Sequence, residues 1–226
     1  MFRPPLRRLS FHHIVAALLA LFLLAGTTLA FNVPLTDESV REAYFLGQRR
    51  DDSMAKYLAQ YKKTLPVPKT GPQVASIEFL TPFAQLVLRS SRRANYSAQQ
   101  ATQEHRRDKE TAVVNIQVQF TDSYGSFTSM QPTNSDSAAR YKLRPPDFWQ
   151  DINVAVEQNN QVLEATDLSG EPTYICGDDG GSCVLTGATI RLEFPAKLFT
   201  SDSADIRVSP PEGPEVTVTF NLTSLR

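Results

Sequence analysis

The sequence predicts an α+β fold in which N-terminal helices are followed by an antiparallel β-sandwich, immunoglobulin-like or similar. Apolar residues recur mainly at helical spacing between residues 37 and 107. From residue 112 onward they alternate with polar residues, as in a strand with one buried and one solvated face. The 226 residues can bury a substantial core. We expect a mainly helical region over 31–110 and a sandwich domain over 111–226.

Residues 1–30 have the pattern of a cleavable signal peptide. Three arginines precede an unbroken apolar run over 14–24, which is shorter than the roughly 20 residues that a spanning helix needs. Thr28-Leu29-Ala30 is an acceptable cleavage tripeptide. We therefore expect an exported protein, periplasmic or secreted, that begins at Phe31. The alternative is an uncleaved anchor over 14–31, which would be the protein's one membrane contact.

Two helices are expected in the first part of this mainly helical region. Thr36 to Ser39 supply capping oxygens and negative charge, which predicts a helix over 37–48. A second helix is indicated by one apolar face that is more typical of a core than of an interface: Met54, Tyr57, Leu58 and Tyr61. Prolines end this pattern and make 65–72 a stiff linker.

A strand over 74–80 is followed by signals for two further helices. Thr81 and Pro82 are typical of an N-cap and a first helical turn, so a helix is predicted over 83–93, with an extended segment as the alternative. Ser97 and Gln100 have the spacing of a capping box, which predicts a helix that ends near Arg107.

The second half contains several runs with the period of a strand. Alternation is clear over 114–120, 152–156, 190–194 and 216–222. Turn-forming residues separate these runs, at 158–161, 167–170 and 210–214. The segment 121–139 is rich in Ser, Thr, Gly and Asn and is predicted to be a long surface loop.

Cys176 and Cys183 flank six turn-prone residues, which predicts a hairpin tip closed by a disulfide. Closing so short a ring stabilises the fold by roughly 2.5 kcal/mol. Asp178 and Asp179 in this tip are candidate binding residues, because calcium prefers several oxygens on a sharply turning loop. The full acidic signature of a calcium loop is absent, so we favour a polar turn and expect no metal or cofactor.

The sequence offers little of the usual catalytic chemistry. Once the signal segment is removed His105 is the one histidine left, and it lies in a hydrophilic helix end, where a solvated or helix-terminal side chain is typical. One imidazole disfavours a histidine-based zinc site or a catalytic triad. Five acids around the first predicted hairpin keep a glycan hydrolase as an alternative: Asp147, Asp151, Glu157, Glu164 and Asp167.

Phe148 and Trp149 form a bulky aromatic pair at the entry to a predicted strand. We expect Trp149 to fill the core, and the alternative is that the pair anchors a ligand or partner. Five arginines over 89–107 indicate a solvated helix face, with an acidic partner or an anionic membrane surface as alternatives.

These observations favour a non-enzymatic envelope or secreted binding module. Its expected partner is another envelope or secreted protein. Nucleic acid is disfavoured because the net charge is −1 even with the arginines of the signal segment included. The alternative function is a carboxylate-dependent hydrolase that acts on an extracellular polymer such as a glycan.

Overall fold

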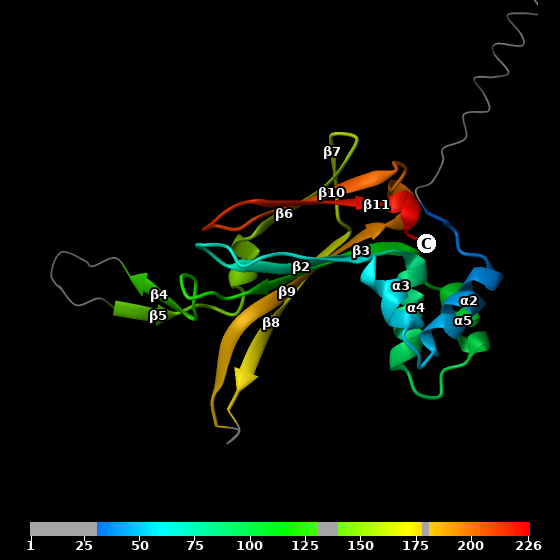
Figure 1. Cartoon of the computed structure of the whole chain (residues 1–226), viewed down its shortest axis with the longest axis horizontal. Helices are drawn as coiled ribbons and strands as arrows, with labels where there is room; N and C mark the ends of the chain where they lie inside the picture. Colours follow the sequence, from blue (N-terminus) through cyan, green and yellow to red (C-terminus); the bar gives the residue numbers. More distant parts are fainter. Residues whose placement is uncertain (1–30, 131–139, 178–180) are drawn as a thin grey trace, which may run out of the picture.

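The computed structural model describes residues 31–130, 140–177 and 181–226. Within these ranges it has an α+β fold, as the sequence predicts, with four α-helices gathered at one end and antiparallel sheets extending from them (Figure 1). The helices are α2 (Asp37–Gly47), α3 (Ser53–Ala59), α4 (Pro82–Arg92) and α5 (Ala98–His105).

The strands form three sheets. The five-stranded sheet has the order β1 (Lys62–Thr64), β2 (Gln73–Leu80), β3 (Thr111–Gln119), β9 (Cys183–Pro195) and β8 (Asp167–Cys176). The four-stranded sheet has the order β11 (Val216–Asn221), β10 (Ser203–Ser209), β6 (Asn153–Gln158) and β7 (Gln161–Leu163). A separate hairpin pairs β4 (Phe127–Met130) with β5 (Arg140–Leu143). All of these pairings are antiparallel.

The predicted helix starts are confirmed by their capping hydrogen bonds. Thr81 Oγ1 accepts a hydrogen bond from the backbone N–H of Ala84 at 3.3 Å, and Pro82 occupies the first helical turn. At α5 the capping box is complete, since Ser97 Oγ accepts from Gln100 N–H at 3.2 Å and Gln100 Oε1 accepts from Ser97 N–H at 2.9 Å. Each such cap satisfies a backbone group that the helix itself leaves unpaired.

The two larger sheets contribute to one buried core. Phe79 of β2 packs against Phe220 of β11, with ring centroids 5.8 Å apart. Phe31 joins them, with its ring centroid 6.2 Å from that of Phe79. A smaller cluster holds the helices together around Val40 and Phe83. Full burial of one such side chain stabilises the fold by about 1.5–3 kcal/mol.

The five-stranded sheet contains strands from both predicted regions, 31–110 and 111–226. Strands β1 and β2 come from the mainly helical region, and β2 pairs directly with β3. The proline-rich segment 65–72 is the connection between β1 and β2. The helices α4 and α5 therefore lie in the connection between β2 and β3, which are neighbours in one sheet.

Two predictions in the second half are wrong. Residues 167–170 are not a turn but the start of β8, and the predicted loop over 121–139 contains β4. By contrast, the turn over 158–161 is confirmed: Asn159 and Asn160 have φ of 51° and 61° and join β6 to β7. Asparagine tolerates this left-handed conformation better than most residues, and tight hairpins require it.

Candidate functional site

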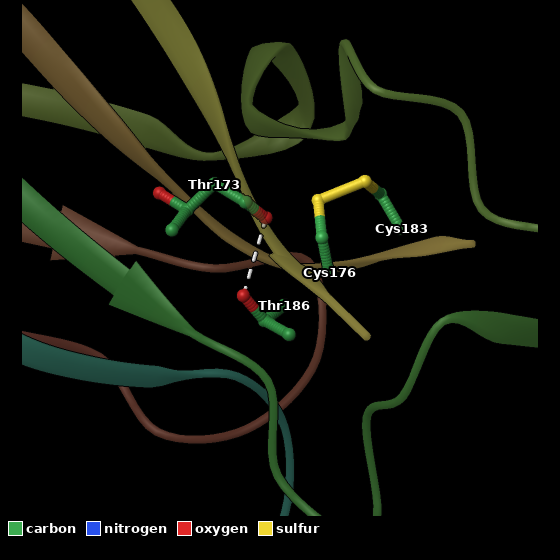
Figure 2. The surroundings of a disulfide bond; sticks show 4 residues. All are labelled: Thr173, Cys176, Cys183 and Thr186. Carbon is green, nitrogen blue, oxygen red and sulfur yellow. Dashed lines mark hydrogen bonds between the residues drawn. A yellow bond between two sulfur atoms is a disulfide. The ribbon is translucent and has the colours of Figure 1, made fainter. Parts of the chain in front are cut away.

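The predicted disulfide is present and closes the end of the β8–β9 hairpin. Cys176 and Cys183 are directly opposite each other in the strand register, and their sulfur atoms are bonded (Figure 2). Below the disulfide, Thr186 Oγ1 donates a hydrogen bond to the carbonyl oxygen of Thr173 at 3.2 Å, across the same two strands. The two strands are therefore held together beyond the edge of the core.

Apolar side chains lie exposed beside this disulfide. Ile175 and Val184 are opposite each other in the register and so lie on one face of the hairpin. Both are more than half exposed, and Tyr174, which lies on the other face, is nearly so. Exposed apolar groups in a cluster differ from the isolated ones that any surface carries.

The β4–β5 hairpin carries a second apolar face. Phe127 is opposite Leu143, and Tyr141 is two residues from Leu143, so these three side chains share one face. Each of the three is more than 60 % exposed. Figure 1 shows this hairpin and the β8–β9 hairpin extending away from the helices. We call these two hairpins the arms.

The arms are connected where they leave the body of the protein. Ser126 Oγ donates a hydrogen bond to the carbonyl oxygen of Leu185 at 2.7 Å, which joins the start of β4 to β9. Arg144 Nε donates to the carbonyl oxygen of Gly125 at 3.0 Å and its guanidinium lies over the Tyr124 ring, 3.5 Å from the centroid. The bond between Ser126 and Leu185 thus connects the two arms at their base, and the Arg144 contacts join the two ends of the β4–β5 arm.

The aromatic pair predicted as a candidate binding site lies near this base. Phe148 is only 2 % exposed and packs against Phe120, with ring centroids 4.9 Å apart. Trp149 is partly buried against the core and covers Gly170 of β8. A role in binding for either residue stays a prediction.

The remaining predicted residues are the two aspartates of the hairpin tip and the five candidate hydrolase acids. Asp178 and Asp179 lie outside the described residues. Among the described residues no group of three or more His, Cys, Asp or Glu side chains is arranged to hold a metal ion. Of the five acids considered for a hydrolase, Glu157 forms an ion pair with Arg207, and Asp167 is opposite Glu193 in the strand register.

A charged groove runs between α4 and the outer face of the five-stranded sheet. It has a larger part of about 1220 Å³ and a smaller part of about 350 Å³, which share Gln85, Arg89 and Arg191. None of the five candidate hydrolase acids lines either part. Eight cationic residues line the groove: Arg89, Arg92, Arg93, Arg106, Arg107, Lys109, Arg191 and Lys197. Five acidic residues line it: Asp37, Glu78, Asp108, Glu110 and Glu193.

Several of these charges neutralise one another. Arg89 Nη1 lies 2.8 Å from Asp108 Oδ2, and Arg191 Nε donates a hydrogen bond to Glu193 Oε1 at 3.0 Å. Arg106 pairs with Asp37, and the hydrogen bond from Arg106 holds the pKa of the Asp37 carboxyl below its ordinary value. The remaining cations give the groove a positive balance.

His105 lies at one side of the groove, at the end of α5. Its Nε2 is 3.0 Å from Glu110 Oε1, and the same carboxylate oxygen accepts a hydrogen bond from the Leu35 backbone N–H at 2.6 Å. His105 is the last residue of α5, which confirms the expectation of a helix-terminal side chain. The side chain is only 15 % exposed, so the alternative expectation of a solvated histidine is wrong. Glu110 therefore joins the end of α5, through His105, to the N-terminal segment, through Leu35.

Sequence reasoning predicted the disulfide-closed hairpin tip of one arm, but it missed the β4–β5 hairpin and the groove. The groove is assembled from residues near positions 33–37, 78–93, 105–115, 166 and 191–197, which only the folded chain brings together. No known protein-family model matches the chain, and no similar sequence was found among curated proteins. Within the described ranges, no helix has the length and apolarity needed to span a membrane.

Proposed function

We propose that the chain is an exported, non-enzymatic interaction module that binds another envelope or secreted protein through the arms. The observation that carries this proposal is the placement of large apolar side chains on both hairpins, where water surrounds them. Covering such side chains with a partner stabilises a complex by about 25 cal/mol for each Å² removed from water, before the costs of association.

The geometry of the arms favours recognition of a protein. Phe127, Tyr141 and Leu143 form a continuous face, and aromatic residues are enriched at the centres of protein interfaces. The disulfide and the hydrogen bond between Thr186 and Thr173 restrain the other hairpin before binding. A surface that is ordered in advance loses less conformational entropy when a partner binds.

Export is supported by the sequence and by the disulfide. The segment over 1–30 has the charge and length pattern of a signal peptide. Disulfides persist mainly in oxidising compartments. Phe31, the first residue after the proposed cleavage site, is 5 % exposed and packs in the core. Intact-mass analysis of the exported protein should give a chain that begins at Phe31, whereas the full-length mass in a membrane fraction would contradict cleavage.

The binding proposal is tested by removing apolar surface from both arms at once. A Tyr141→Ser/Ile175→Ser variant should lose a partner that the unmodified protein captures from envelope extracts of its source cells. The matched control is Phe45→Ser/Val162→Ser, because both residues are 62 % exposed but lie on α2 and β7. The control should retain the partner. Equal capture by both variants, with circular dichroism unchanged, would contradict binding through the arms.

A further inference from the structure

We propose that the charged groove between α4 and the five-stranded sheet binds an acidic peptide segment of the protein partner. This inference rests on the proposed function, in that the partner is a protein, but it concerns a different surface from the arms. It is carried by the charge balance of the groove, by the origin of its unpaired cations and by the chemistry of its walls.

The charge balance of the groove is opposite in sign to that of the whole chain. Eight cationic and five acidic residues line it, although the chain as a whole has a net charge of −1. A concave surface with an excess of one sign concentrates its electric field and attracts ligands of the other sign. The groove is therefore suited to a ligand that carries several negative charges.

Part of this positive charge has no internal partner. Arg92, Arg107, Lys109 and Lys197 have no carboxylate within 4.0 Å among the described residues. Arg92 is in the last turn of α4, where a cation also stabilises the helix dipole.

That local explanation does not extend to the other three residues. Arg107 and Lys109 lie on the connection between α5 and β3, and Lys197 lies in the short helix η2 (Ala196–Leu198). Separate segments of the chain thus bring unpaired cations to one groove. A ligand that carries carboxylates would form ion pairs with these cations, which have no carboxylate partner within the described part of the fold.

The floor of the groove offers hydrogen bonds of the kind that a peptide uses. Glu78, Asn115 and Arg191 are neighbours in the strand register of β2, β3 and β9, and all three line the smaller part. Asn115 Nδ2 donates to Glu78 Oε2 at 3.1 Å, which keeps the amide oriented across the sheet. Because Arg191 already donates from Nε to Glu193, the oriented Asn115 amide is the group of this floor that offers a hydrogen bond to a peptide.

The walls disfavour other polyanions. The apolar residues that line the two parts are aliphatic or proline, such as Leu80, Leu86 and Leu88, and no described lining residue is phenylalanine, tyrosine or tryptophan. Proteins that bind single-stranded nucleic acid stack its bases on aromatic rings. An acidic peptide needs no such stacking, and its side-chain methylene groups can pack against aliphatic walls.

The test is a titration of the full exported protein with a fluorescein-labelled peptide of alternating glutamate and serine, followed by fluorescence anisotropy. The unmodified protein should bind at low salt and bind progressively less as salt rises. Lys109→Gln/Lys197→Gln should weaken binding roughly fivefold, since each exposed ion pair is worth a fraction of a kcal/mol to about 1 kcal/mol.

The matched control removes the same charge elsewhere. Lys56 in α3 and Lys69 in the proline-rich segment are exposed and lie outside the groove. Lys56→Gln/Lys69→Gln should leave the affinity within twofold of the unmodified protein. No binding by the unmodified protein, or equal losses in both double variants, would overturn the proposal.

Two further measurements separate this inference from its alternatives. Unlabelled peptide should displace the probe at lower concentrations than polygalacturonate or inorganic phosphate, and the reverse order would overturn the assignment to a peptide. The Tyr141→Ser/Ile175→Ser variant should bind the peptide normally. If the Tyr141→Ser/Ile175→Ser variant also kept its protein partner, binding through the arms would be contradicted. The peptide titration would still decide whether the groove binds an acidic peptide.

Discussion

Tyr61 and Arg226 are 165 positions apart and are joined by two hydrogen bonds. The Tyr61 hydroxyl accepts from the backbone N–H of Arg226 at 2.9 Å and donates to the carbonyl oxygen of the same residue at 3.0 Å. Burial, and then the hydrogen bond with Tyr61, raise the pKa of the neighbouring Tyr57 hydroxyl, so the Tyr57 phenol keeps its proton. The Arg226 guanidinium also pairs with Glu42 of α2. The last residue of the sequence therefore joins the sheets to the helices.

Replacing Tyr61 with phenylalanine should lower the free energy of unfolding by about 1–2 kcal/mol, because the buried Tyr61 side chain loses both of its hydrogen bonds to the Arg226 backbone. Urea unfolding followed by circular dichroism measures this change. Tyr174→Phe is the control, since its side chain is nearly half exposed, and it should change stability by less than about 0.5 kcal/mol. Equal stability of both variants would show that the two hydrogen bonds contribute nothing.

Substituting Gly170 with alanine should displace Trp149. A Cβ at position 170 would lie 2.1 Å from two ring carbons of the Trp149 indole, which is far closer than atoms can approach. We expect a loss of about 1–3 kcal/mol in the free energy of unfolding. Trp149 is the one tryptophan of the chain, so its emission should shift to longer wavelength as the indole becomes exposed.

The control for this substitution is Gly125→Ala, because a Cβ at position 125 would have no atom within 4 Å. Its fluorescence and stability should match those of the unmodified protein. An unshifted emission spectrum in Gly170→Ala would mean that Trp149 does not cover β8 as described.

Gly170 also shows why part of the fold could not be predicted. Asp167, Ser169 and Gly170 have the composition of a turn, yet they belong to β8, an edge strand that is exposed along most of its length. Such a strand buries no regular alternate set of side chains, so the period of two is lost. Its pairing with β9 and its cover by Trp149 are tertiary effects that local composition does not encode.

Where local chemistry dominates, the sequence was sufficient. The Thr81 cap and the Ser97–Gln100 capping box were predicted because each satisfies backbone groups within a few residues. Strand β10 has buried residues at alternate positions, including Ile206 and Val208, and the same alternation analysis could have found it. The groove could not be found in this way, because its cations are unpaired only as a result of the three-dimensional arrangement.

Breaking the disulfide should increase local opening of the β8–β9 arm more than it destabilises the rest of the protein. Cys176→Ser/Cys183→Ser should lower the free energy of unfolding by at most roughly 2.5 kcal/mol, because the closed ring is short. Amide hydrogen exchange should accelerate in β8 and β9 near the tip but not in β3. Thiol labelling of the denatured, unreduced protein should find no free cysteine. Labelling of two thiols would contradict the bond.

The pair formed by Asp37 and Arg106 should make stability depend on pH in the acidic range. The pKa of Asp37 is lowered in the folded protein, so the carboxylate stabilises the fold above its ordinary pKa of 3.8. That contribution is lost as the pH falls below 3.8 through the lower folded pKa. Arg106→Gln should be less stable than the unmodified protein at pH 6, and the two should converge near pH 2 in urea unfolding. A constant difference at both pH values would contradict the pairing.

Substituting His105 with alanine should leave partner capture intact and reduce only stability. Loss of the contact with Glu110 should cost about 1 kcal/mol, because the carboxylate still accepts the Leu35 N–H. Glu110→Ala should cost more, about 1–3 kcal/mol, since it also leaves that backbone N–H without its acceptor. Urea unfolding ranks the two variants, and affinity capture from envelope extracts measures the retained function.

This pair of variants distinguishes a structural histidine from a catalytic one. An enzyme that uses a general base near neutral pH commonly recruits histidine, and His105 is the one histidine after residue 30. If His105→Ala abolished the biological role while its folded fraction, its expression and its affinity for the acidic peptide matched the unmodified protein, the binding proposal would be contradicted. If instead Glu110→Ala were the less stable variant and both still captured the partner, His105 would act through Glu110 to hold the N-terminal segment against the α5–β3 connection, as the distances indicate.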